Sequence, residues 1–253
     1  MPELAIILPT YNEDENLALV VEQLEGLGLD LHVLVVDDNS QDGTQQIALE
    51  MKQRFGNVTL IARPKKLGLG SALKAGLIEA LATDARYVMT MDADCSHDPK
   101  DVPRLLEAAR RGGSDLVQAS RYIKGGGMQG SPFLRRMPSR CVNLFYHFIA
   151  GAPQECTTSL RIFTRRAASL VVERCKGQDF EFMPEVMFLV LAAGLKVEQV
   201  PIVFLPRHGG DSKLGVKQAA MGLASVFSNT LLYRLRLGRY RRRPFHDTFP
   251  GSS

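Results

Sequence analysis

The sequence predicts an α/β fold: a single domain with a mainly parallel central sheet flanked by helices. Short apolar runs rich in β-branched residues alternate with stretches of helical periodicity through the first half of the chain. The runs show no polar alternation, which is typical of parallel strands buried on both faces. The 253 residues, 45% of them hydrophobic and 23% charged, exclude a disordered or collagen-like chain.

The predicted elements follow one another in a regular order. Strands are expected at residues 4–8, 32–38, 58–62, 87–94 and 115–120. Helices are expected between them near 14–27, 44–55, 70–82 and 101–111, with Asn12 and Asp42 as start signals. Right-handed crossovers then bring the carboxyl ends of the strands to one edge of the sheet, where such folds bind ligands.

The second half departs from this alternation. A glycine-rich loop at 124–131 precedes a helix at 133–150, a strand at 158–163, helices at 165–174 and 182–193, and a strand at 197–205. A polar loop at 207–213 leads to a last amphipathic helix from about 215 to 237. No internal repeat and no linker rich in Pro, Gly or Ser divides the chain.

The charge is concentrated at the C-terminus. Lys and Arg number 31 and Asp and Glu 27, a net +4, and from residue 234 onward six arginines and one aspartate give +5, which leaves −1 for the rest. This asymmetry predicts a local anionic partner and argues against nucleic-acid binding. Because the uncharged stretch of the last helix, 218–233, is too short to span a bilayer, we expect peripheral contact with an anionic membrane. A disordered tail beside a helix packed on the sheet is the alternative.

The cysteines and the N-terminus indicate the compartment. The four cysteines contain no CxxC spacing, so neither a zinc site nor a disulfide framework is expected. The apolar run Leu4–Leu8 is too short for a signal peptide, and no transmembrane helix is expected. A cytoplasmic protein is the simplest interpretation.

Acidic side chains follow two of the predicted strands. Asp92 and Asp94 end the fourth strand, where two carboxylates can hold Mg²⁺ or Mn²⁺ together with a substrate phosphate. Asp37 and Asp38 end the second strand and can accept hydrogen bonds from a ribose or a base. Ordinary loop capping is the alternative for both pairs.

Other candidate residues have weaker signals. Pro9, Tyr11 and Glu13 end the first strand, either as a turn and helix cap or as the wall of a nucleotide site. Arginines and lysines beside the later loops either lie in solvent or hold phosphate groups, and they are Arg121, Arg135, Arg136, Arg140, Arg207 and Lys213.

Together these motifs resemble the family 2 inverting glycosyltransferases of GT-A fold, within the dolichol-phosphate (polyprenyl-phosphate) mannose synthase group. The segments that carry the resemblance run in order from residue 6 to about 215 and are ILPTYNEDENL, VVDDNSQDGT, KLGLGSALKAGL, MDADCSHDP, ASRYIKGGG, TSLRIF, EVMFLVLAAGLKVEQVPI and RHGGDSKLG. The resemblance implies a GT-A nucleotide-sugar-binding domain at 1–214, followed by a membrane-interfacial helix and basic tail at 215–253.

The resemblance also implies a role for individual residues. The nucleotide sugar would contact Pro9, Tyr11, Glu13, Asp38, Asp92, Arg207 and Lys213. The metal, Mg²⁺ or Mn²⁺, would lie on Asp92 and Asp94, and the phosphate of the lipid acceptor on Arg121, Arg135 and Ser139. Residues expected to act in catalysis are Asp94, Arg121 and Arg207. Some relatives carry glutamine where this chain has Ser96, so a contribution of Ser96 or His97 to metal binding stays open.

The implied reaction is transfer of mannose from GDP-mannose to a polyprenyl phosphate, on the cytoplasmic face of a membrane, where a membrane-anchoring partner subunit remains open. A phosphate monoester has a second pKa near ~6, so the acceptor is mostly dianionic at neutral pH and needs positioning more than a general base. The alternatives are another donor such as UDP-glucose, and a non-catalytic membrane-associated nucleotide-sugar binder.

Overall fold

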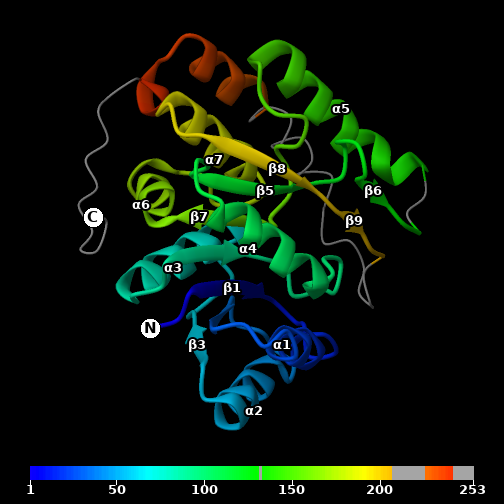
Figure 1. Cartoon of the computed structure of the whole chain (residues 1–253), viewed down its shortest axis with the longest axis vertical. Coiled ribbons are helices and arrows are strands. Elements are labelled where there is room, and N and C mark those ends of the chain that lie inside the picture. The colour runs from blue at the N-terminus through cyan, green and yellow to red at the C-terminus, as the bar shows by residue number, and fades with distance from the viewer. Residues whose placement is uncertain (131–132, 207–225, 242–253) are drawn as a thin grey trace.

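A central sheet with helices on both faces forms the body of the protein (Figure 1). The computed structural model describes residues 1–130, 133–206 and 226–241, with the backbone alone at 133–136. In this part the sheet has the order β3-β2-β1-β4-β7-β5-β8. The bounds are β1 (Leu4–Thr10), β2 (Leu31–Asp37), β3 (Val58–Ala62), β4 (Tyr87–Thr90), β5 (Leu116–Ser120), β7 (Arg161–Thr164) and β8 (Val197–Pro201). All run parallel except β7, which is antiparallel to both of its neighbours, so the predicted mainly parallel sheet is confirmed.

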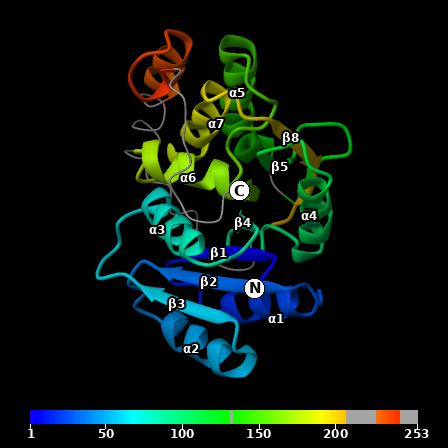
Figure 2. The ribbon, with the colours of Figure 1, turned by 60° about the vertical axis from the view of Figure 1, so that its left-hand side comes forward.

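Alternating side chains of the strands enter two cores. In β1, Ala5 and Ile7 pack with helices α3 (Leu69–Ala82), α6 (Arg165–Arg174) and α7 (Phe182–Ala192). The intervening Leu4, Ile6 and Leu8 pack on the opposite face, with α1 (Leu17–Glu25), α2 (Thr44–Phe55) and α4 (Val102–Arg110). Figure 2 shows β1, β2 and β3 side by side with these helices around them. Both faces of the strands are therefore buried, as their unalternating sequences predict.

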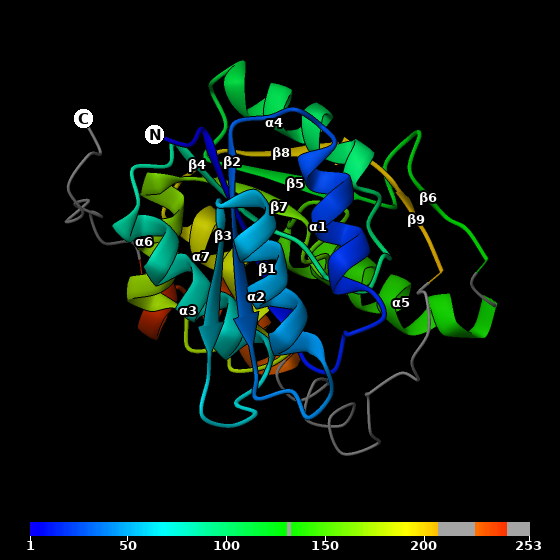
Figure 3. The same ribbon diagram turned by 90° about the horizontal axis from the view of Figure 1, so that it is seen from below.

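A two-stranded parallel sheet lies beside this core, formed by β6 (Gly127–Met128) and β9 (Val203–Phe204). Figure 3 shows the pair near α5 (Phe133–Ala150). The prediction of one strand over 197–205 was wrong, because the chain changes partners at Ile202. The amide of Ile202 still donates to Ser120 on β5, whereas its carbonyl accepts from Gly127.

Other predicted boundaries also differ, and the strand expected at 158–163 begins only at Arg161. The fourth strand ends at Thr90 and not at 94, and the following residues turn, with Cys95 in a left-handed conformation (φ 60°). The first helix begins at Leu17, after residues 13–16 have formed turns. Asn12, expected to start it, has φ 55° and accepts the Gln41 amide with its side chain. The 3₁₀ turn Pro99–Asp101 precedes α4.

The described C-terminal residues pack on α7. Residues 226–234 are helical, while 215–225 of the predicted amphipathic helix and 242–253 of the basic tail lie outside the described residues. The ring of Tyr233 stacks on Phe188 at 4.7 Å, Tyr240 is fully buried, and Arg239 pairs with the buried Glu185 at 3.1 Å. One tail arginine is thus held inside the fold. Across the residues that the structure describes, no helix has the length and hydropathy needed to cross a membrane.

Candidate active site

Both halves of the chain reach the edge of the sheet where β1, β2, β4 and β5 end. Because β7 is antiparallel, its amino end lies at this edge, and the segment that precedes it, residues 153–160, arrives there too. The predicted carboxylates come from the first hundred residues, whereas Arg121 and Ser139 come from later in the chain. The edge therefore gathers two chemically different groups of residues.

Asp92 and Asp94 lie in the loop directly after β4. The Asp94 carboxylate is mostly buried, and its Oδ1 accepts from the Ser96 amide at 3.1 Å and from the Ser96 hydroxyl at 2.5 Å. The Asp92 side chain is 24% exposed. Ser96 therefore orients one carboxylate of the pair, while the other is accessible from the edge.

The fit of this pair to a divalent cation rests on its donor chemistry. Mg²⁺ sites in proteins use one or two carboxylates and leave the remaining positions to water and substrate phosphates, which matches this pair. No group of three or more His, Cys, Asp or Glu side chains that could hold a metal occurs within the described ranges. A metal held here would take its other ligands from the diphosphate of a donor and from water.

His97 lies under the carboxylate pair rather than beside it. Its side chain is 1% exposed, its Nδ1 lies 3.9 Å from Oδ2 of Asp92, and its ring packs edge-on against Phe204 at 5.4 Å between centroids. Burial lowers the pKa of His97 despite the nearby Asp92 and Asp94 carboxylates. The imidazole is therefore neutral at pH 7 and supports the loop from its buried side.

Asp38, predicted to bind the nucleoside, organises the loop after β3. Its carboxylate accepts from Arg63 and from the amides of Leu67 and Gly68, each amide at 3.0 Å. Arg63 also donates to the Ser71 hydroxyl at 2.5 Å, at the start of α3. Sequence reasoning missed Arg63, for which the only signal was a cation directly after a predicted strand.

Asp37 is fully buried and bonds to side chains at the ends of both strands. Its carboxylate accepts from the Thr10 hydroxyl at 3.0 Å, from Ser40 and from Gln45. These bonds join the ends of β1 and β2. Asp37 therefore fixes the ends of β1 and β2, whereas Asp38 holds the 63–68 loop.

Pro9, Tyr11 and Glu13 line the same corner. Pro9 is the penultimate residue of β1, and the Tyr11 ring lies 3.7 Å from the Lys66 ammonium. The Glu13 amide donates to the Thr44 hydroxyl at 2.8 Å. Of the three, Tyr11 contacts the 63–68 loop through Lys66, whereas Glu13 bonds to the first residue of α2.

Arg121 lies at the end of β5 in a dense polar network. Its Nε and Nη2 each donate to the Glu155 carboxylate at 2.9 Å, and Nη2 also lies 3.1 Å from the Thr157 hydroxyl and 3.5 Å from the Ser139 hydroxyl. Glu155 is fully buried, and its Oε1 accepts from Thr157 at 2.7 Å and from Asn143 at 3.3 Å. Burial lowers the pKa of Arg121, but the charge and hydrogen bonds of Glu155 outweigh this and raise it. Arg121 is therefore a fixed cation.

This network brings Arg121 and Ser139 together, and it adds Glu155, Thr157 and Asn143, which sequence reasoning missed. A cleft of about 330 Å³ opens beside it, lined by Arg121, Tyr122, Arg140, Asn143, Leu144, His147, Phe148 and Gln154. Arg135 lies in the first turn of α5, where only the backbone is described, and Arg207 and Lys213 lie outside the described residues. The cleft combines a cation and hydroxyls with an apolar rim, which suits an anionic group attached to a hydrocarbon chain.

Comparison with known proteins agrees with this geometry. Residues 5–170 match the model of glycosyl transferase family 2. The polyprenol monophosphomannose synthase of Mycolicibacterium smegmatis is 34% identical over 212 residues, covering 83% of this chain and 80% of that protein. The undecaprenyl-phosphate mannosyltransferase of Micrococcus luteus is 37% identical over 212 residues, covering 82% and 86%.

Among solved structures, glucosyl-3-phosphoglycerate synthase from Mycobacterium tuberculosis, in complex with Mn²⁺, uridine diphosphate and glucosyl-3-phosphoglycerate, superposes with a TM-score of 0.68. Its identity is 17%, over 94% of this chain and 81% of that one, and it shares the GT-A-like fold. The chain is a glycosyltransferase that belongs to glycosyl transferase family 2 and, within it, to the polyprenyl-phosphate mannose synthase group.

Proposed function

We propose that this glycosyltransferase transfers mannose from GDP-mannose to a polyprenyl phosphate, with inversion at the anomeric carbon. The observation that carries the proposal is the Arg121–Ser139 cleft, which lies at the same sheet edge as the Asp92–Asp94 pair. The names of the two curated relatives support the transferred sugar and the lipid acceptor. GDP as the nucleotide rests on the sequence resemblance.

The acceptor phosphate binds to Arg121, Ser139 and Arg135 in this proposal. One of its oxygens forms a bond to the anomeric carbon of mannose while the bond from that carbon to the diphosphate breaks, and the diphosphate leaves with the bonding electrons as GDP. A phosphate dianion has no proton to lose, so the step needs no general base. The fixed charge of Arg121 holds the dianion in line with the bond that breaks.

The donor binds at the opposite corner. Pro9, Tyr11, Glu13 and Asp38 contact the nucleoside, and Arg207 and Lys213 are proposed to bind the pyrophosphate, where Arg207 stabilises the departing charge. Asp92 and Asp94 hold Mg²⁺ or Mn²⁺, which supplies positive charge for the diphosphate when it is bound. The Lys66 ammonium over Tyr11 adds a further cation near the donor.

A polyprenyl acceptor requires contact with a membrane, and we propose peripheral binding to its cytoplasmic face. Large apolar side chains are exposed on two adjacent helices, with Phe145 of α5 packed on Phe227 at 5.2 Å between ring centroids. The exposed residues are Leu144, Phe148 and Ile149 on α5, and Phe227, Leu231, Leu235 and Leu237 near the C-terminus. This apolar surface supports a membrane-interfacial role for the segment 215–253, and α5 contributes apolar side chains to the same surface. It also leaves room for an anchoring partner subunit.

The test is a donor panel with a polyprenyl phosphate acceptor, measured as lipid-linked product with and without EDTA. We expect transfer from GDP-mannose alone, loss of transfer with EDTA, and a β-linked product. Product from UDP-glucose instead would show that the donor assignment is wrong. Absence of any product with all donors would favour a non-catalytic nucleotide-sugar binder.

Asp94→Asn tests the metal site, and a second variant in the same loop controls for general damage to that loop. Loss of one of two metal carboxylates should lower kcat at least about 100-fold, a loss of roughly 2.7 kcal/mol in transition-state stabilisation. The matched control is Asp98→Asn, in the same loop, where the side chain caps a 3₁₀ turn by accepting the Lys100 amide, which asparagine does as well. Equal losses in the two variants would remove the metal assignment.

A further inference from the structure

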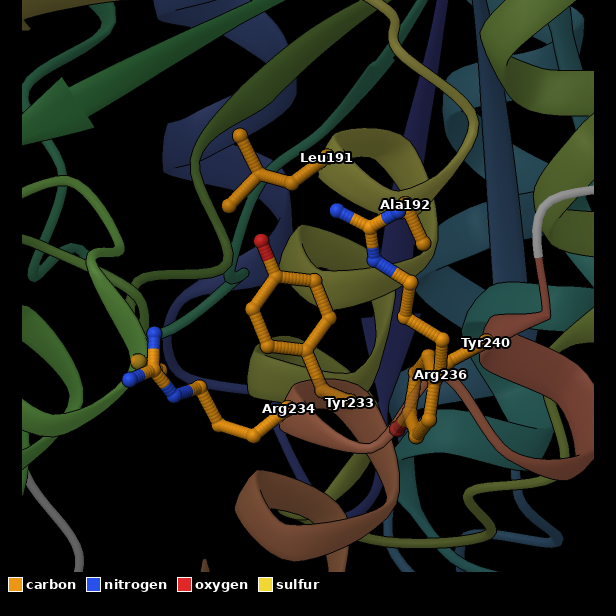
Figure 4. A pocket seen from close by; sticks show the side chains of 7 residues that line it. Leu191, Ala192, Tyr233, Arg234, Arg236 and Tyr240 are labelled. Carbon is orange, nitrogen blue, oxygen red and sulfur yellow. The ribbon is translucent and has the colours of Figure 1, made fainter.

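A second cationic cleft lies at the end of α5, away from the acceptor cleft. It has a volume of about 120 Å³ and is lined by Ala150, Leu191, Ala192, Tyr233, Arg234, Arg236 and Tyr240. Arg234 and Arg236 are exposed, and Figure 4 shows their side chains on either side of Tyr233. The C-terminal helix and the turn that ends it thus contribute two positive charges to one small cleft.

These two arginines have no acidic partner among the described residues, unlike their neighbour. Arg239 lies three residues beyond Arg236 and donates to Asn229 at 2.7 Å while pairing with Glu185. Arg239 is therefore committed to the fold, whereas Arg234 and Arg236 present their charge to the cleft and to solvent.

The backbone of Arg236 has a left-handed conformation that glycine adopts more easily than any residue with a side chain. Arg236 has φ 53° and lies just after the C-terminal helix. Its amide donates to the Tyr233 carbonyl at 3.1 Å, and the Leu237 amide donates to the Leu232 carbonyl at 2.9 Å. This pair of bonds is the Schellman arrangement, whose left-handed position is usually glycine because a side chain there is strained. A strained residue in an exposed cleft makes its side chain a candidate for a function.

The surroundings of the cleft define the ligand. Leu231, Leu235 and Leu237 are at least half exposed on the same segment, and Phe148 of α5 is 76% exposed. Arg140, at the acceptor cleft, is ten residues before Ala150 on α5, a rise of about 15 Å along the helix. Two cationic clefts therefore lie along one helix with apolar side chains between them, which suits a phospholipid with its phosphate in the cleft and its chains against the leucines.

We propose that Arg234 and Arg236 form a second phosphate-binding site, which takes the headgroup phosphate of an anionic phospholipid and orients the acceptor cleft toward the bilayer. The proposal rests on the membrane location in the proposed function. Helices α5 and α7 end at the cleft, at Ala150 and Ala192, and the negative ends of their dipoles oppose the arginines for any phosphate, free or lipid-bound. The leucines add apolar contacts that only a lipid can make, so the site favours a headgroup over soluble phosphate.

The experiment measures sedimentation of the whole chain with phosphatidylcholine vesicles and with vesicles that contain phosphatidylglycerol. A basic residue near an anionic surface contributes about fivefold in partition, so Arg236→Gly should lower binding to the anionic vesicles about fivefold. The double variant Arg234→Gln/Arg236→Gly should lower it about 25-fold, since the two contributions multiply. The matched control is Arg166→Gln. Arg166 is an exposed arginine in the first turn of α6 that does not line the cleft, so its loss should change binding by less than about twofold.

Arg236→Gly also has a readout that excludes damage to the fold. Glycine relieves the left-handed strain, so the Tm of this variant should equal or exceed that of the wild type while vesicle binding falls. Unchanged vesicle binding in Arg236→Gly, or an equal fall in Arg166→Gln, would overturn the proposal. Binding of inorganic phosphate as tight as binding of the vesicles, measured by calorimetry, would overturn the lipid assignment.

A failure of the proposed function would look different. Transfer to a short-chain polyprenyl phosphate in detergent, which requires no bilayer, should be unaffected in Arg236→Gly. If the wild type gives no such transfer, the proposed reaction is wrong, whereas the vesicle result still decides whether the headgroup site exists.

Discussion

The ion pair between Arg121 and Glu155 offers a quantitative test of the acceptor network. Both side chains are almost fully removed from solvent, and two parallel hydrogen bonds of 2.9 Å join them. Removing one partner of a buried pair leaves an uncompensated charge and costs about 3–5 kcal/mol. We expect Arg121→Gln and Glu155→Gln each to lose about 3 kcal/mol of unfolding free energy, seen as a fall in Tm of roughly 6–12 °C.

The double variant decides whether the loss comes from the pair itself. With both charges of the pair removed, neither partner is left as a buried charge without the other, so Arg121→Gln/Glu155→Gln should cost at least about 2 kcal/mol less than the sum of the single variants. Urea unfolding followed by circular dichroism measures all four proteins. Additive losses would refute the reasoning, because they would mean that the two side chains stabilise the fold independently. The exposed pair Arg54–Glu22 is the matched control, since its coupling should stay below about 1 kcal/mol.

Three further predictions concern packing, thiols and pH. Gly76→Ala should lower the unfolding free energy by about 1–2 kcal/mol, because the new Cβ would lie 2.4 Å from a methyl group of Ile7 on β1. The control Gly26→Ala, where the new Cβ has no atom nearer than 3.4 Å, should change it by less than about 0.5 kcal/mol, both measured by urea unfolding. A thiol reagent at pH 8 should label Cys141 first, since it is exposed, and labelling that is equally fast in Cys141→Ser would contradict this. Burial raises the pKa of Glu185 against the opposing charge of Arg239, so its protonated form favours the fold. The unfolding free energy of the wild type relative to Glu185→Gln should therefore fall as the pH rises from about 4.5 to 7, and a flat difference would contradict the assignment.

The alternation of strands and helices could be predicted because burial on both faces leaves a local signature. The apolar runs that begin at Leu4 and Val33 are continuous, and both became central strands with alternate residues in two cores. The direction of β7 could not be predicted in this way. An apolar run such as that at Arg161–Thr164 has the same composition in a parallel or an antiparallel strand.

The sequence indicated residues of the candidate site but not their partners. Asp94, Arg121 and Ser139 lie at the expected edge, and their placement follows from the ends of strands and the start of a helix. The buried carboxylate of Glu155 could not be assigned, because its contact with Arg121 spans 34 residues and depends on the direction of β7. Likewise, nothing local in the sequence indicates that Asp38 holds Arg63.

The antiparallel strand β7 also sets the layout of the enzyme. It lies between β4 and β5 and so separates their carboxyl ends by two strand spacings, about 10 Å. On the proposed function, the residues that bind the nucleoside and the metal come from the first hundred positions, while those that bind the acceptor phosphate come from positions 121–139. The nucleoside and the acceptor phosphate are thus recognised by two separate stretches of the chain. Recombination within the connection between α4 and β5 could exchange one specificity and keep the other, which gives this architecture a simple route to new pairs of sugar and acceptor.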